Sequence, residues 1–385
     1  MVYLDNSATT RQHPRVTEKM IQMMDVTFGN PSSLHHMGLE GEKAIKEARG
    51  SLLDALGGGT VVFTSGGTEA DNMAVFGAAE ALKRRGKKIV STAVEHPAVE
   101  ECLSKLEEMG FDVVRIGVDQ NCRLDMEQLE DAIDKDTILV SIMGVNNEVG
   151  TVMPVNEVAE MVKGKNAPAL IHCDGVQSFG KIPVPAGIDM LSISGHKIHG
   201  PKGSGALWLR KGVNIPPLIR GGGQEKGMRS GTENVPAIAG LGVAAAIGTE
   251  NMESNFKRAE SLRKMLMEGL EDGLEDIIIN SPRQGGSDPG SCSPYILNVS
   301  FLGTRGEVIL HTLEQDEIYV STGSACSSNK KGQSHVLKAM GLKDKEIEGA
   351  IRFSLSWDNT PEEIQMTLEK TVDAVKRFRM LGSFR

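Results

Sequence analysis

Lys197 is the residue of this 385-residue chain whose type and setting best suit covalent chemistry. It lies in a Gly/His-rich stretch between an apolar run that ends at Ser194 and a second run that begins at Gly205. This pattern predicts a turn between two strands. A lysine amine forms a Schiff base with a carbonyl cofactor once its surroundings lower its pKa or hold it against the carbonyl. Most lysines are simply exposed, so this interpretation needs support from other residues.

Two upstream stretches supply that support. Asp174 ends an apolar strand pattern, where an unpaired carboxylate would be costly, and a protonated pyridine nitrogen would meet its need for a cation. Residues 64–69 form a Gly/Ser/Thr loop before a helix pattern, whose free N–H groups and hydroxyls would hold a phosphate. An amine, an acid and an anion cradle are the parts that pyridoxal phosphate needs. Each stretch alone also fits an ordinary helix cap.

Four further residues have types that suit a reaction site. His96 and Asn147 each follow a strand pattern, although a lone loop histidine is more often a surface residue. Cys326 stands in a Ser/Gly/Lys loop, which marks a candidate reactive thiol or an incidental surface cysteine. Arg352 lies in a short apolar run and needs a carboxylate, either from the protein or from a substrate.

Composition excludes several classes of protein. The formal net charge of −9 argues against a general nucleic-acid binder. Five scattered cysteines without a Cys-x-x-Cys pair fit neither a disulfide framework nor a zinc site, so we expect a reducing compartment and no metal. No basic-then-apolar signal peptide opens the chain, and the longest apolar run, residues 235–247, is too short to span a bilayer. We expect a soluble cytoplasmic protein without membrane contact.

Strand and helix patterns alternate over most of the chain. Continuous apolar strands separated by helices predict an α/β fold with a mainly parallel sheet covered on both faces. Functional loops should gather at the carboxyl ends of those strands. From about residue 252 the amino-acid composition changes to Lys/Glu-rich helical segments. We therefore predict a large domain over residues 15–250 and a small α+β domain over residues 251–385, with residues 1–14 packing near the small domain.

Taken together, these stretches resemble the pyridoxal phosphate-dependent cysteine desulfurases, in particular the group that supplies sulfur for iron–sulfur cluster assembly. The likeness runs from Tyr3 to about Trp357, with the motifs in family order. It rests on Asn30-Pro-Ser-Ser, Thr64-Ser-Gly-Gly-Thr-Glu, Glu95-His, Asn146-Asn-Glu, Asp174 with Gln177, Ser194-Gly-His-Lys, Met228-Arg-Ser-Gly-Thr, Ser324-Ala-Cys-Ser and Arg352-Phe-Ser. The family implies the aspartate-aminotransferase-like fold (type I), a homodimer, and an active site completed across the dimer interface.

The resemblance also implies a role for each matching residue. Lys197 matches the Schiff-base lysine, and Asp174 matches the partner of the pyridine nitrogen. Gln177 matches the contact to the ring hydroxyl, and His96 matches the histidine that stacks on the ring and transfers protons. Gly67, Thr68, Ser194 and His196 match phosphate contacts, and Thr232 matches one that reaches in from the other subunit. Asn147 and Arg352 match the binders of the substrate carboxylate. Cys326 matches the nucleophile that becomes a persulfide.

The implied function is a cysteine desulfurase that converts L-cysteine to L-alanine. It would pass sulfur to an acceptor or scaffold protein for iron–sulfur cluster assembly or tRNA thiolation, with no direct contact to nucleic acid expected beyond such partners. A selenocysteine lyase, another type I aminotransferase and a non-catalytic scaffold are the alternatives.

The sequence departs from the family near the expected ring. Cys173 stands where an aliphatic residue is usual, Gly67 replaces a frequent alanine, and Gly175-Val176 replaces a small-then-hydroxyl pair.

Overall fold

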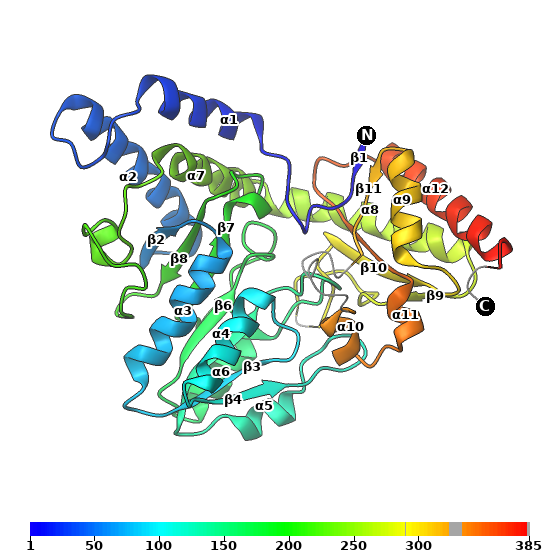
Figure 1. Cartoon of the computed structure of the whole chain (residues 1–385), viewed down its shortest axis with the longest axis horizontal. Coiled ribbons are helices and arrows are strands. Elements are labelled where there is room, and N and C mark those ends of the chain that lie inside the picture. The colour runs from blue at the N-terminus through cyan, green and yellow to red at the C-terminus, as the bar shows by residue number, and fades with distance from the viewer. Residues whose placement is uncertain (289, 323–332, 383–385) are drawn as a thin grey trace.

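The computed structural model describes residues 1–288, 290–322 and 333–382. Its centre is a seven-stranded sheet (Figure 1). In spatial order the strands are β2 (Thr60–Thr64), β8 (Gly205–Leu209), β7 (Met190–Ser194), β6 (Leu170–Asp174), β5 (Thr137–Met143), β3 (Lys88–Thr92) and β4 (Asp112–Ile116). All neighbouring pairs from β7 to β4 are parallel, whereas β8 runs antiparallel to both β2 and β7. The predicted mainly parallel sheet is confirmed.

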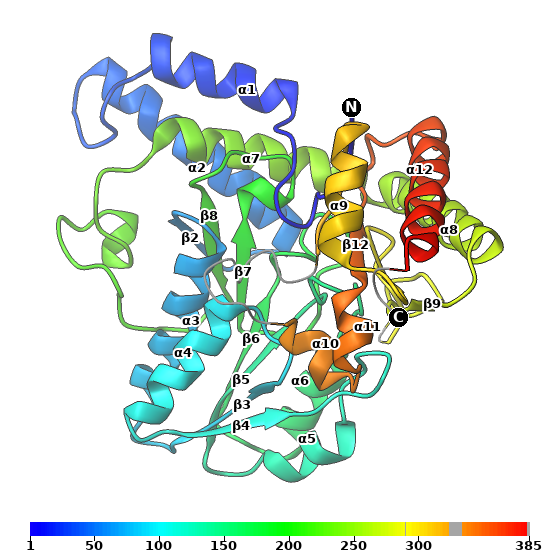
Figure 2. The ribbon, with the colours of Figure 1, turned by 45° about the vertical axis from the view of Figure 1, so that its right-hand side comes forward.

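Helices cover both faces of this sheet because alternate strand residues point to opposite sides. Val62, Ile89 and Leu207 pack against α3 (Gly67–Leu82) and α4 (Pro97–Glu108), which lie together in Figure 2. Val61 and Val140 belong to the cluster of the other face. That face is covered by α2 (His36–Leu56), α6 (Val155–Gly164) and α7 (Val235–Glu250), with α1 (Pro14–Ile21) against α7 and α5 (Met126–Ala132) near β4.

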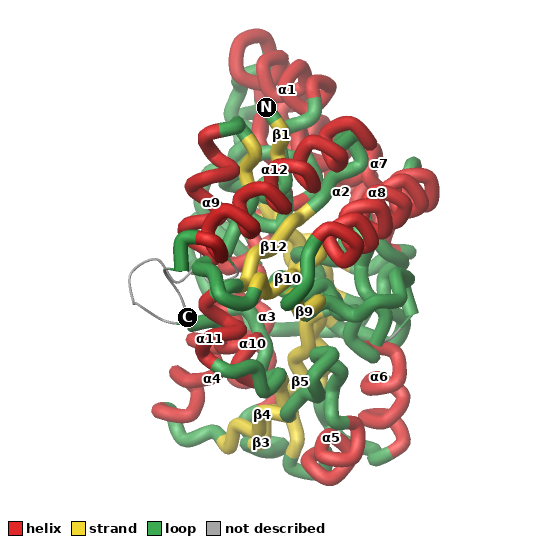
Figure 3. Tube along the Cα trace, turned by 90° about the vertical axis from the view of Figure 1, so that its right-hand side faces the viewer, coloured by secondary structure: helices red, strands yellow, loops and turns green. Residues whose placement is uncertain are grey.

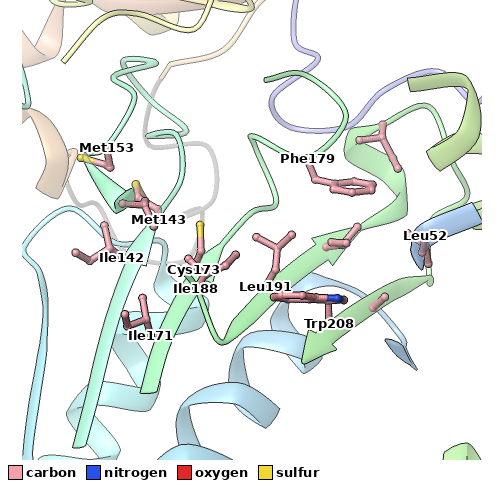
Figure 4. Packing of buried hydrophobic residues seen from close by; sticks show 14 of the residues in the cluster. Leu52, Ile142, Met143, Met153, Ile171, Cys173, Phe179, Ile188, Leu191 and Trp208 are labelled. Carbon is pink, nitrogen blue, oxygen red and sulfur yellow. The ribbon is translucent and has the colours of Figure 1, made fainter. Parts of the chain in front are cut away.

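Figure 4 shows part of the cluster on this other face of the sheet. Cys173, Leu191 and Trp208 lie side by side on neighbouring strands β6, β7 and β8, where the strand register pairs them. Cys173 is fully buried, and burial raises the pKa of its thiol well above the usual value. Because Asp174 is the next residue along β6, its side chain points to the opposite side. The cysteine that departs from the family pattern is therefore a core residue.

A separate hydrophobic cluster lies in the C-terminal part of the chain. Figure 3 shows the helices and strands that carry it. It is built on the antiparallel sheet β12 (Ala350–Ser354), β10 (Ile296–Phe301) and β9 (Ile277–Ile279), with α8 (Met252–Gly273), α9 (Gly306–Gln315) and α12 (Pro361–Met380). The first strand, β1 (Val2–Tyr3), pairs in parallel with β11 (Ile318–Tyr319), and Leu4 joins the cluster. The short helices α10 (His335–Ala339) and α11 (Asp344–Glu348) pack instead against the large cluster. The division at residues 250 and 251 stays a prediction.

The N-terminal segment after β1 is a turn without regular strand structure, apart from an isolated bridge at Asp5. Its backbone amides pair with Ser354 and His196, which are distant in sequence. α1 continues directly into a π-helical turn over residues 22–26.

No single helix among the described residues is long and apolar enough to cross a membrane. Only α7 and α8 taken together, bent by 71° at their junction, reach the required length and composition.

Candidate active site

The carboxyl ends of β5, β6 and β7 meet the start of α3 at one cavity of about 240 Å³. Ten of the twelve predicted site residues line it: Gly67, Thr68, His96, Asn147, Asp174, Gln177, Ser194, His196, Lys197 and Arg352. Exposed Thr232 lines a separate cavity with Ser65 and Arg229 instead. Cys326 lies outside the described residues. Strand ends of a parallel sheet collect side chains in this way because they share one edge.

Lys197 reaches the cavity from a short 3₁₀ turn, Gly195–Lys197, that directly follows β7. Its Nζ donates to the backbone carbonyls of Ser7, at 2.5 Å, and Ala8, at 2.8 Å. The carbonyl of Ser7 also accepts a hydrogen bond from Nε2 of Gln177 at 2.9 Å. The N-terminal segment thus fixes the amine and the amide side by side, which the sequence did not indicate.

Asp174 supplies a buried carboxylate at the end of β6. Its side chain accepts the amide of Val176 at 2.9 Å, so it does cap the following turn, as the alternative interpretation expected. Burial raises its pKa to about 6, although the Val176 amide and the charge of Lys197 act in the opposite direction. A cation such as a protonated pyridine nitrogen would stabilise this carboxylate. The capping interpretation of Asp174 is confirmed, and its role as partner of a pyridine nitrogen stays a prediction.

The start of α3 suits a phosphate. Its N-cap residue, Gly66, has no side chain that could cap the helix. The first-turn amides of this 16-residue helix therefore remain available for an anion. Thr68 and Ser194 lie beside it in the cavity wall. Together with Asp174 and Lys197, this cradle fits the phosphate, ring nitrogen and aldehyde of pyridoxal phosphate.

Gly67 makes room for Val176 at this cradle. A Cβ at residue 67 would lie 2.6 Å from Cγ2 of Val176, closer than such atoms approach. Valine is β-branched and has few rotamers with which to yield. The two departures from the family pattern, a glycine at 67 and a valine at 176, therefore compensate each other across the cavity wall.

This contact gives a prediction. Gly67→Ala should displace the start of α3, and since overpacking costs roughly 1–3 kcal/mol, the Kd for pyridoxal phosphate should rise about tenfold. Adding Val176→Ala should restore most of the affinity, because it removes the opposing methyl groups. Equilibrium titration of cofactor into the four proteins of this double-mutant cycle measures the coupling. Purely additive effects would contradict the contact.

His96 is the N-cap residue of α4, and its Nδ1 accepts the amide of Ala98 at 3.1 Å. Burial lowers its pKa to about 4, and the charges of Lys197 and His335 add to this. The neutral ring therefore carries its proton on Nε2. That state suits stacking and hydrogen-bond donation better than holding an additional proton. His196 is also neutral, since burial lowers its pKa to about 4, and its Nδ1 lies 3.1 Å from Oγ1 of Thr9.

Arg352 brings a buried guanidinium from β12 to the opposite wall. Its Nη1 donates to the backbone carbonyl of Asn147 and its Nη2 to Oδ1 of Asp5, both at 3.0 Å. The carboxylate that its burial requires is thus supplied by the protein, from a residue that sequence reasoning did not single out. Arg352 and Asn147 nevertheless both line the cavity.

Asp71 is another lining residue that was missed. It lies four residues after Gly67 on the buried face of α3 and is 1% exposed. Burial, with the charge of Asp174, raises its pKa well above the ordinary value. An acid on the apolar face of a predicted helix was the available signal. Burial therefore favours the neutral form of Asp71 beside Asp174.

Comparisons with known proteins agree with this geometry. Residues 2–367 match the family model of aminotransferase class V. The chain is 41% identical over its whole length to cysteine desulfurase IscS of Dictyoglomus turgidum, covering 97% of that protein. It is 42% identical to cysteine desulfurase IscS of Escherichia coli, over 99% of this chain and 94% of the relative. A solved structure described as a NifS-like protein superposes with a TM-score of 0.90 at 41% identity, over 98% of this chain and 99% of that one.

Proposed function

The chain belongs to the aminotransferase class-V family and, within it, to the cysteine desulfurases, and from this we propose how its own residues carry out the reaction. It is a pyridoxal phosphate-dependent enzyme of the aspartate-aminotransferase-like fold that converts L-cysteine to L-alanine and transfers the sulfur. The observation that carries the residue assignment is the convergence of Lys197, Asp174, Arg352 and the start of α3 on one cavity.

Residues of the cavity wall would hold the cofactor. The uncapped amides at Gly67 and Thr68, with Ser194 and His196, would hold its phosphate; Asp174 would pair with the ring nitrogen and Gln177 with the ring hydroxyl. When bound, pyridoxal phosphate supplies an aldehyde that captures amines and a ring that accepts electrons from the α-carbon of an amino acid. Neutral His96 would stack on the ring face.

The remaining residues act on the substrate. Arg352 and Asn147 would orient the carboxylate of L-cysteine, and the amine of Lys197 would move the proton at the α-carbon. The Cys326 thiolate would then attack the substrate sulfur. A sulfur–sulfur bond forms as the carbon–sulfur bond breaks, and with proton return the products are L-alanine and a Cys326 persulfide. Lys330 and Lys331 would favour the thiolate.

The flanks of the Cys326 segment support this role. Ser321 exchanges two backbone hydrogen bonds with Arg352, a residue of the cavity wall. Beyond the segment, Ser334 donates to the buried carboxylate of Glu148 at 2.5 Å, and Nε2 of His335 lies 2.9 Å from the carbonyl of Glu95, next to His96. Five residues of chain can span at most roughly 17 Å, so Cys326 has the reach to approach the cavity.

We propose a homodimer in which Thr232 completes the partner's phosphate site. Thr232 is exposed and lines no wall of its own chain's cavity. Large exposed apolar side chains also follow one another near α1 and the start of α2, with Phe28 70% and Leu34 95% exposed. Such a gathering is typical of a surface that another protein covers. The four described cysteines are free and buried, which supports a reducing, cytoplasmic setting.

We propose that the persulfide is passed to an acceptor protein for iron–sulfur cluster assembly or tRNA thiolation. A loop cysteine suits that transfer better than a core cysteine would, because the thiol must meet two partners in turn.

Incubating the purified protein with pyridoxal phosphate, L-cysteine and a thiol reductant should yield L-alanine and sulfide in equal amounts. Rejection of L-cysteine with turnover of L-selenocysteine would instead indicate a selenocysteine lyase. Dependence on a 2-oxo acid would indicate an aminotransferase, and no turnover of any of these would indicate a scaffold. Quantifying L-alanine and sulfide together separates these outcomes.

A further inference from the structure

Asp5 stands beside the guanidinium that would bind the substrate carboxylate. We propose that Asp5 is the positioning residue of Arg352: it holds the guanidinium in the orientation that receives the carboxylate of L-cysteine. This inference rests on the proposed function, because it presupposes that Arg352 binds that carboxylate. Asp5 itself is not among the residues lining the cavity, so it would act through Arg352.

The contacts of Arg352 define its orientation. Nη1 donates to the carbonyl of Asn147 and Nη2 to Oδ1 of Asp5, each at 3.0 Å, so the planar fork is held at two of its three nitrogens. Its Nε is buried and has no hydrogen-bond partner among the described residues. Since the Asn147 acceptor is a backbone atom, Asp5 is the side chain that sets the orientation of the guanidinium plane.

Asp5 is itself fixed by the strand that carries Arg352. Ser354, two residues along β12 and on the same face as Arg352, donates its amide to the carbonyl of Leu4 at 2.7 Å and accepts the amide of Asn6 at 3.1 Å. Its Oγ accepts the amide of Ser7 at 2.9 Å. Leu4 is fully buried in the C-terminal cluster. The acid and the arginine therefore belong to one locally rigid unit.

The charge and exposure of Asp5 and Arg352 indicate whether Asp5 orients the guanidinium or blocks the substrate carboxylate. Arg352 is 2% exposed, so without a carboxylate its charge would be buried against carbonyl oxygens alone. The side chain of Asp5 keeps 23% of its surface and contacts a single nitrogen through a single oxygen. A bidentate ion pair with Asp5 would occupy the guanidinium donors, whereas this contact through one oxygen leaves donors for a second carboxylate. The arrangement orients Arg352 without competing for it.

The experiment measures binding of L-alanine, which has the substrate's carboxylate but no thiol, to the holoenzyme. Loss of a charge-assisted hydrogen bond should raise the Kd for L-alanine about tenfold or more in Asp5→Ala, and about threefold in Asp5→Asn, which keeps an acceptor oxygen. L-Alaninamide, whose carboxylate is replaced by an amide, should bind all proteins alike. The KM for L-cysteine should follow the Kd for L-alanine while kcat stays within about threefold.

Tyr3→Phe is the matched control. It alters the same segment by removing the hydroxyl that donates to the carbonyl of Thr9 at 2.9 Å, and it leaves the Asp5–Arg352 contact in place. Its Kd for L-alanine should equal that of the wild type. Thermal unfolding of each variant monitors the fold, and if Asp5→Ala does not fold, the comparison of L-alanine with L-alaninamide on Asp5→Asn carries the test.

Arg352→Gln distinguishes failure of this inference from failure of its premise. If Arg352→Gln weakens L-alanine binding but Asp5→Ala does not, Asp5 has no positioning role. Tighter L-alanine binding in Asp5→Ala would mean that Asp5 competes with the substrate, which also overturns the inference. If Arg352→Gln itself leaves L-alanine binding unchanged, the proposed role of Arg352 is wrong.

Discussion

Cys326→Ala should reduce L-alanine formation from L-cysteine by at least about a thousandfold, because the variant lacks the nucleophile that accepts the sulfur. The cofactor should remain bound with its visible absorption unchanged, since none of the residues proposed to hold it is altered. Parallel assays of L-alanine and of bound pyridoxal phosphate measure the two effects.

Cys102→Ala is a suitable control for the cysteine experiment. Cys102 is 3% exposed on α4, and its thiol donates to the carbonyl of Ala98. Burial raises its pKa to about 12, so it is a poor thiolate at neutral pH. Alanine is well tolerated in a helix, and activity should be retained. Undiminished turnover in Cys326→Ala would refute the persulfide assignment without affecting the assignment of the cofactor cavity.

Lys197→Ala should abolish the visible absorption of covalently held cofactor and reduce turnover by about ten-thousandfold, because no other lysine among the described residues lines the cavity to form the Schiff base and move the α-proton. Lys197→Arg should be as inactive, since a guanidinium keeps the charge but cannot form the bond. Spectra of both variants after loading with pyridoxal phosphate, followed by L-alanine assays, provide the measurement.

The control here is Lys202→Ala, five residues further along the same connection between β7 and β8. Lys202 is exposed and does not line the cavity. Its removal should leave both the spectrum and the rate unchanged. Retention of the covalent band in Lys197→Ala would show that another amine holds the cofactor, and Lys181, which is buried near Gln177, would be the first to test.

Site residues that end strands were predictable one by one. Asp174 and Ser194 close apolar runs, and the glycine and hydroxyl residues of 64–69 separate a strand from a helix. Because the strand ends of a parallel sheet meet at one edge, the sequence positions of these residues predict that they share one cavity. The resemblance to a known family added the phosphate contact of His196, whose type alone would not have singled it out.

The N-terminal segment was beyond such reasoning. Residues 5–10 show no periodicity and cap no element, yet Ser7 and Ala8 hold Lys197, and Thr10 bonds to the carbonyl of His196. These contacts join residues nearly two hundred positions apart. Local pattern carries no information about such pairs, because they exist only once the C-terminal sheet has packed beside the large one.

By itself, the sequence determined the elements, the parallel sheet and the chemistry that the cavity can support, because hydrophobic period, turn residues and the order of polar strand ends are local properties. Only the tertiary structure decided the partners of the buried charges. That Arg352 pairs with Asp5, and that Gly67 yields space to Val176, follow from packing between segments distant in the chain. A buried charge requires a partner, but which residue supplies it depends on how the whole chain folds.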